Sequence, residues 1–220
     1  RTPAPDYIAK QAASGWIATT NSSFSGLADG QPYFFRVKAR DIAGNESAFA
    51  SAVTSQQDAS APASHVLALG SYKSNSTLAL EWSATDALSG VSGVQLFYAK
   101  DGGPFTLYPN GPYTATPIAF DASTTGGDGA YAFYTIAADN VANAETAPEA
   151  ADATTIIDTQ APAVPAIAAL PAFTPGASRD MTWDDQAASG AAEYRIQAST
   201  TPTFEAIAST SDWIAGLTHT

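Results

Sequence analysis

A chain of 220 residues with a net charge of −12 lacks the basic surface that nucleic-acid binding requires, and an anionic membrane surface would repel it. It contains no cysteine, which excludes disulfides, thiolate metal sites and thiol nucleophiles. Hydrophobic residues make up 45% of the chain, enough for packed cores, but they form no run long enough for a transmembrane helix.

The first predicted elements are short strands. DYIAKQA, around Tyr7, and YFFRVKARD, from Tyr33, are rich in aromatic and aliphatic residues that alternate with polar ones. This two-residue period is typical of a strand with one buried face. The segment GLADG, residues 26–30, precedes the second strand and supplies turn residues.

Residues 58–157 carry the clearest strand pattern. TLALEWSA, VSGVQLFYAK and YAFYTIA alternate in the same way, and the Gly- and Pro-containing clusters SGVSG, KDGGP, PNGP and TTGGDG separate them. Ala-rich TAPEAADATT contains Pro148, which favours a loop that leads into a last strand. We therefore expect a self-contained sandwich of seven strands without a long helix, in which Trp82 is buried between the sheets.

The remaining residues repeat the earlier ones at a period of about 100. DTQAP begins at Asp158, 100 positions after DASAP at Asp58, and Trp183 stands 101 positions after Trp82. Tyr33 and Tyr131 each precede an aspartate by eight positions. Several matches at one period indicate tandem copies of one antiparallel all-β fold.

The segment GLADGQPYFFRVKARDIAGNES resembles strands E to G of a fibronectin type III domain. In that family a corner tyrosine bonds back to the backbone. The middle copy has TTGGDGAY in place of the Leu-Gly corner and resembles bacterial immunoglobulin-like domains. The resemblance implies tandem immunoglobulin-like sandwiches without shared catalytic residues. The structural residues that it implies are the corner residues Leu27, Gly30, Tyr33 and Tyr131 and the strand-B tryptophans Trp82 and Trp183.

The resemblance also implies three domains. Residues 1–57 match strands C to G of a partial domain, 58–157 a complete domain, and 158–220 strands A to E of a second partial domain. Gly216-Leu217 align with Gly26-Leu27, so we expect the strand that follows this corner to be absent at the C-terminus. Strand donation between neighbouring chains would leave duplicated strands, so we expect a window on a longer tandem array.

Candidates for chemistry are few. His65 and His219 stand in different copies, and no Gly-x-Ser-x-Gly elbow occurs. The glycine-rich GGDG at 126–129 precedes a strand, whereas a phosphate-binding loop precedes a helix. The sequence therefore predicts no catalytic residues, no cofactor-binding residues and no metal-binding residues.

Calcium is the one cofactor that the sequence leaves open. Asp and Asn residues flank the predicted strand ends and linkers, and hard oxygen ligands that converge between domains can bind calcium. No Asp-x-Asp-x-Asp loop is present, and local Asx turns explain the same residues. These residues are Asp41, Asn45, Asp139, Asn143, Asp58 and Asp158.

Aromatic residues offer a second open alternative. Trp16, Trp213, Tyr98, Tyr108 and Tyr113 could stack on sugar rings, although sandwich cores and edges also need aromatic residues.

The chain as a whole is predicted to be a non-catalytic stalk, spacer, filament or surface-layer segment of a larger secreted or cell-surface bacterial protein. Its expected partners are neighbouring repeats of the same longer chain, or like chains in an assembly. The alternatives are an adhesive or carbohydrate-binding module, and an accessory region of a large secreted hydrolase.

Overall fold

The computed structural model describes residues 15–215 and 218–219. The described chain is all-β, as predicted, and its helical turns are the short 3₁₀ segments η1 (Ala122–Thr124) and η2 (Ala187–Ser189). It divides into two compact units, residues 1–157 and 158–220. The finer division into three domains stays a prediction, and the strand predicted around Tyr7 lies outside the described residues. No described residue belongs to a helix with the length and hydropathy needed to cross a lipid bilayer.

The first part of the chain forms a hairpin. Strand β1 (Pro32–Phe35) pairs antiparallel with β2 (Val53–Gln56). The regular strand is shorter than the sequence predicts, because only isolated backbone bonds continue the hairpin beyond Phe35. Ala50 N donates to Val37 O at 2.8 Å, and Arg40 forms a bridge with Glu46.

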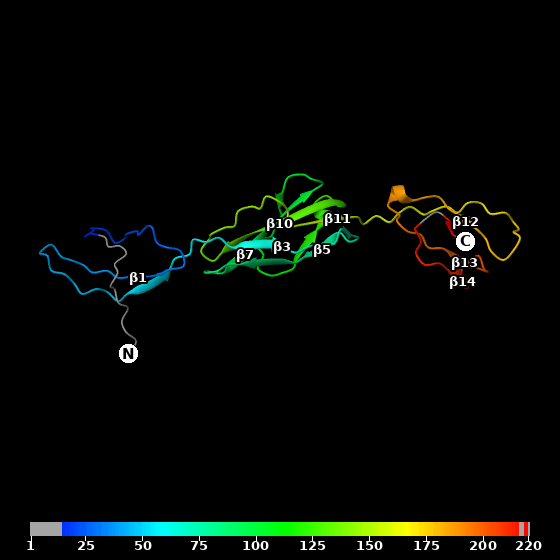
Figure 1. The fold of residues 1–220 in the computed structure, drawn as a ribbon. Helices are drawn as coiled ribbons and strands as arrows, with labels where there is room; N and C mark the ends of the chain where they lie inside the picture. The colour runs from blue at the N-terminus through cyan, green and yellow to red at the C-terminus, as the bar shows by residue number, and fades with distance from the viewer. Residues whose placement is uncertain (1–14, 216–217, 220) are drawn as a thin grey trace, which may run out of the picture. The chain divides into compact units, whose positions relative to one another are not determined.

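The middle of the chain contains a five-stranded sheet (Figure 1). Its order is β4 (Tyr72–Lys73), β11 (Ala153–Ile157), β10 (Gly129–Asp139), β7 (Val91–Lys100) and β8 (Thr106–Leu107). Neighbouring strands run antiparallel except β4 and β11, which run parallel.

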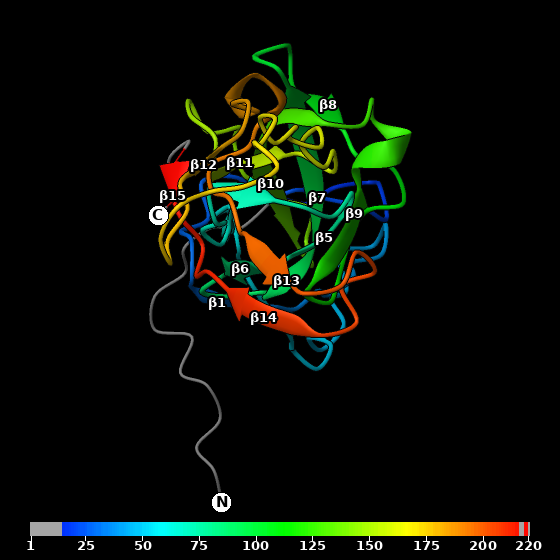
Figure 2. The same cartoon turned by 90° about the vertical axis from the view of Figure 1, so that its right-hand side faces the viewer.

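A second set of strands faces this sheet. Strand β3 (Ala63–Val66) pairs with β6 (Trp82–Thr85), and β5 (Thr77–Leu80) pairs with β9 (Ile118–Asp121), beside which it lies in Figure 2. The expected count of seven strands is therefore wrong, because residues 58–157 contain nine. Glu81 separates β5 from β6, and the chain leaves β3 to add β4 to the opposite sheet.

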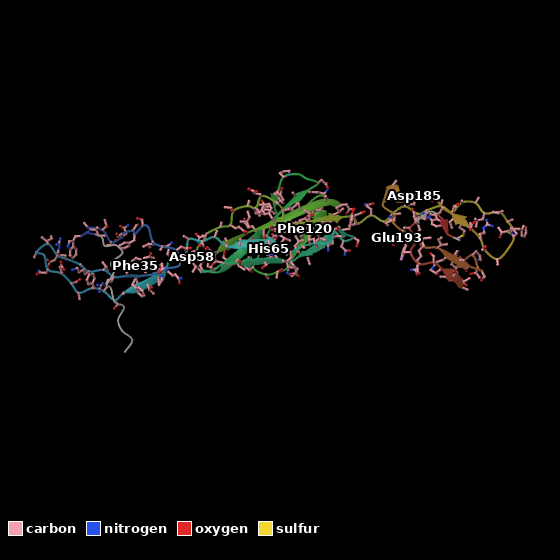
Figure 3. The ribbon with its side chains drawn as sticks, viewed as in Figure 1. Phe35, Asp58, His65, Phe120, Asp185 and Glu193 are labelled. Carbon is pink, nitrogen blue, oxygen red and sulfur yellow. The ribbon has the colours of Figure 1, made fainter. Side chains whose placement is uncertain are left out.

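Alternation along the strands builds the core of this β-sandwich. In β5, β9 and β11 every second side chain is buried, and β10 buries the odd-numbered residues from Tyr131 to Asp139. Phe120, labelled in Figure 3, is fully buried among the rings of Tyr98, Tyr108, Tyr131 and Phe133. Because each aromatic side chain buries about 150–250 Å², this cluster contributes a large part of the apolar surface buried in the sandwich.

The second unit contains two short antiparallel pairs. Strand β12 (Met181–Thr182) pairs with β15 (Thr218–His219), and β13 (Gln197–Ser199) pairs with β14 (Ile207–Thr210). The first pair corrects the predicted alignment of this end of the chain. Gly216 and Leu217 lie outside the described residues, but a paired strand follows them, whereas a turn follows Leu27. A different alignment agrees with the structure. If WIA at 213–215 is aligned with WIA at 16–18, Thr218 corresponds to Asn21, which precedes the turn after Leu27.

Candidate functional site

Each predicted corner tyrosine bonds to the backbone that precedes it. In the first part, Ala28 N donates to the Tyr33 hydroxyl at 2.7 Å. Gly30 has φ +71° there, a left-handed conformation that favours glycine, and Leu27 is half-buried. Leu27, Gly30 and Tyr33 together therefore shape the turn that precedes β1.

Tyr131 makes the corresponding contact in the middle sandwich from a buried position. Its hydroxyl donates to Gly127 O at 2.6 Å and lies 3.2 Å from Thr125 Oγ1, and the residue is 1% exposed. A glycine-rich turn thus replaces the Leu-Gly corner while a tyrosine hydroxyl still bonds back to it. Tyr194 in the second unit also receives a backbone bond, from Gln186 N at 2.7 Å.

The two predicted core tryptophans differ in burial. Trp183 is 8% exposed, and its ring centroid lies 5.5 Å from that of Tyr194. Trp82, which was expected to be buried between the sheets, packs against the core and is partly buried. Its indole N–H donates to Ala115 O at 3.3 Å, and a ring that must reach this loop carbonyl lies at the rim of the core.

Three aspartates from separate segments converge at one end of the middle sandwich. Asp58 lies in the linker before β3 (labelled in Figure 3), Asp86 directly follows β6, and Asp139 ends β10. One carboxylate oxygen from each of the three lies within 4.8 Å of those of the other two. Among residues 15–215, no other group of three or more acidic or histidine side chains lies close enough together to hold a metal ion.

Backbone amides hold the carboxylates of Asp58 and Asp86. Asp58 accepts from Ser60 N at 3.1 Å and from Ser89 N at 2.9 Å. Asp86 uses Oδ1 alone, which accepts from Leu88 N at 3.0 Å and from Gly90 N at 2.6 Å. The bonds from Ser60, Leu88 and Gly90 lie within local Asx turns, the geometry that aspartate favours. The bond from Ser89 instead links the linker to the loop after β6.

Asp139 is the most buried of the three, at 3% exposure. Burial acts to raise the pKa of the Asp139 carboxyl. Hydrogen bonds act in the opposite direction, because Asn143 donates through its side chain and its backbone N–H and Val141 donates through its backbone N–H. The net effect is a pKa below the ordinary value. The carboxylate is therefore charged at neutral pH. Asn143 Nδ2 also donates to Asp58 O at 3.3 Å, which links the linker to this turn.

The predicted Asx turns are confirmed at both repeats of the motif. Asn45 donates to Asp41 through its backbone N at 2.8 Å and through Nδ2 at 2.9 Å, as Asn143 does to Asp139. Sequence reasoning missed Asp86. The available signal was the repeat itself, since an aspartate and a Ser-Gly pair follow both Trp82 and Trp183.

The aromatic residues that the sequence left open as a sugar platform differ in burial. Tyr108 is buried, and Tyr98 and Tyr113 pack against the core, so these three tyrosines belong to the interior. Trp16 and Trp213 are 47% and 61% exposed. Cationic side chains lie over both rings: Arg40 at 4.3 Å and Lys38 at 5.5 Å from the Trp16 centroid, and Arg195 at 5.9 Å from that of Trp213.

Comparison with known proteins finds similarity to one part of a larger enzyme. The chain is 30% identical over 169 residues to chitinase A1 of Niallia circulans, an alignment that covers 73% of this chain and 22% of that protein. The chain thus spans about a fifth of the length of the curated relative it matches. No protein-family profile and no solved structure matches it.

Proposed function

We propose that this chain is a non-catalytic structural segment of a larger secreted protein, and that it serves as an accessory spacer region in a polysaccharide-degrading hydrolase of bacterial origin. The observation that carries the proposal is the similarity to chitinase A1, which extends over most of this chain but only 22% of the relative. A match of that proportion supports an accessory region more than a complete enzyme.

The middle sandwich has the properties of a rigid spacer. Its two longest strands, β7 and β10, contain 10 and 11 residues and pair side by side. At about 3.4 Å per residue, such strands span about 35 Å. Each sandwich would therefore set a fixed distance between the parts of the protein on either side of it, with neighbouring repeats as its partners.

The aspartate group does not suit glycoside hydrolysis. A glycosidase needs two carboxyl groups that reach the sugar, one as an acid and one as a nucleophile or base. Asp139 is almost completely buried, and backbone amides occupy the oxygens of Asp58 and Oδ1 of Asp86. His65, labelled in Figure 3, is paired with Ser83 across β3 and β6 and is not a member of the aspartate group. These contacts support a non-catalytic role.

The test uses the purified 220-residue chain in two assays. We expect no release of fluorophore from chitooligosaccharide substrates above the buffer blank, and no co-sedimentation with insoluble chitin. Turnover that one point substitution abolishes would contradict the non-catalytic role. Chitin binding that is lost in Trp16→Ala or Trp213→Ala would replace the spacer role with the carbohydrate-binding alternative.

A further inference from the structure

We infer that Asp58, Asp86 and Asp139 form a calcium-binding site at the end of the middle sandwich. The three oxygens that face one another lie within 4.8 Å. Calcium binds oxygen ligands at about 2.3–2.6 Å, so ligands on opposite sides of one ion lie up to about 4.6–5.2 Å apart. A single ion can therefore contact all three carboxylates.

A second observation points to a missing cation. Oδ2 of Asp86 is fully buried and receives no hydrogen bond, while both amide donors bond to Oδ1. A buried carboxylate oxygen without a partner is unfavourable unless a donor or a cation satisfies it. The Asp86 turn already supplies its donors to the other oxygen, and Asp86 contributes a carboxylate oxygen to the group that contains Asp58 and Asp139.

No cationic side chain neutralises the group. Between residues 15 and 215, the ion pairs join Lys38 to Glu46 and Lys100 to Asp101, and neither involves the three aspartates. The three carboxylates lie close together and Asp139 is almost completely buried, so water screens the repulsion between them poorly. A bound divalent cation would remove this repulsion.

The ligand set favours calcium over other metals. Carboxylate oxygens prefer hard cations, and the group offers neither the cysteine nor the histidine ligands typical of zinc. Magnesium requires near-octahedral ligands at about 2.0–2.1 Å, whereas calcium accepts six to eight oxygens in irregular arrangements. Three carboxylates already held in place by backbone amides fit the more tolerant ion, and water would complete its coordination.

Calcium at this position would fasten the linker to the sandwich. Asp58 belongs to the linker, whereas Asp86 and Asp139 belong to loops at strand ends. Asp29 of the preceding part accepts from Ala59 N at 2.7 Å, so it also holds this linker. Calcium would then stiffen the junction before β3. This consequence, unlike the calcium site itself, rests on the proposed spacer role.

The test compares Asp86→Asn with a matched control, Asp41→Asn, in the full chain after treatment with chelator. Asparagine keeps the oxygen that accepts from Leu88 and Gly90 but replaces the charged, unpartnered oxygen with an amide. Asp41 also accepts hydrogen bonds within a local turn, from Asn45, but is not part of the carboxylate group. Titration calorimetry measures calcium affinity, and thermal unfolding is followed in chelator and in millimolar calcium. Asp58→Asn serves as a second variant in case Asp86→Asn does not fold.

We expect calcium to raise the melting temperature of the unmodified chain by about 3 °C or more, and Asp86→Asn to weaken calcium binding by about tenfold or more. In chelator, the same substitution should leave stability unchanged or raise it, because it relieves repulsion. If the Asp86 turn has only a structural role, Asp86→Asn should instead lower the melting temperature both in chelator and in calcium. The inference is overturned by an absence of calcium binding, by equal stabilisation with magnesium, or by an equal loss of affinity in Asp41→Asn. Any of these results leaves the proposed spacer role intact.

Discussion

Removal of the Tyr131 hydroxyl should destabilise the middle sandwich although it leaves the aromatic core in place. The hydroxyl donates to Gly127 O at 2.6 Å from a residue that is 1% exposed, so Tyr131→Phe leaves this carbonyl without its donor in a partly buried turn. A net hydrogen bond contributes about 0.5–1.5 kcal/mol, and a buried group left unsatisfied costs about 1–3 kcal/mol. We expect a loss of about 1–2 kcal/mol.

Tyr33→Phe provides the matched control, because Tyr33 accepts from Ala28 N in an exposed part of the chain where water can replace the hydroxyl. Its expected effect is below about 0.5 kcal/mol. Native-state hydrogen exchange on peptides from β10 measures the opening free energy within the full chain. For Tyr131→Phe, exchange should accelerate about 5- to 30-fold. Unchanged exchange in Tyr131→Phe, or an equal loss from the two substitutions, would refute the account of the buried corner.

Two further substitutions test the core and the surface charges. Phe120→Ala should lower the opening free energy by about 3–5 kcal/mol, because it removes a fully buried ring. Phe105→Ala removes an exposed ring that contacts Tyr134 and should lower it by about 1 kcal/mol. Similar losses from the two substitutions would contradict the assigned core. A hydrogen bond from Lys100 lowers the pKa of Asp101 below its ordinary value of 3.8. Ionised Asp101 should therefore stabilise the fold at neutral pH, and this stabilisation should be lost as the pH falls through the pKa of Asp101 in the folded chain. Thermal unfolding across acidic pH should therefore show Asp101→Asn and the unmodified chain converging, and a constant difference would contradict the assignment.

Local pattern was sufficient to predict the two longest strands of the middle sandwich, β7 and β10. VSGVQLFYAK was predicted as a strand and forms β7 over the same residues, since it combines strand-forming residues with glycine-containing boundaries. The shortness of β1 could not be predicted in this way, because a strand requires a paired neighbour as well as a suitable sequence. Beyond Phe35 only isolated bonds supply that pairing. Trp82 shows the same limit, since its partial burial depends on the position of the Ala115 loop.

The aspartate group was harder to predict because its members meet only in the folded chain. Asp139 and Asn143 form a local turn of five residues, which the sequence indicated. Asp86 follows a different strand, and Asp58 precedes the first strand of the sandwich, so their proximity depends on the order of strands in both sheets. Each aspartate taken alone fits a capping or turn role. Backbone amides bond to both oxygens of Asp58, and backbone amides together with the Asn143 side chain bond to both oxygens of Asp139. Only Oδ2 of Asp86 departs from this explanation, because it is buried without a donor. That one atom separates a set of independent turns from a site that needs a cation, so substitution of Asp86 is the decisive experiment.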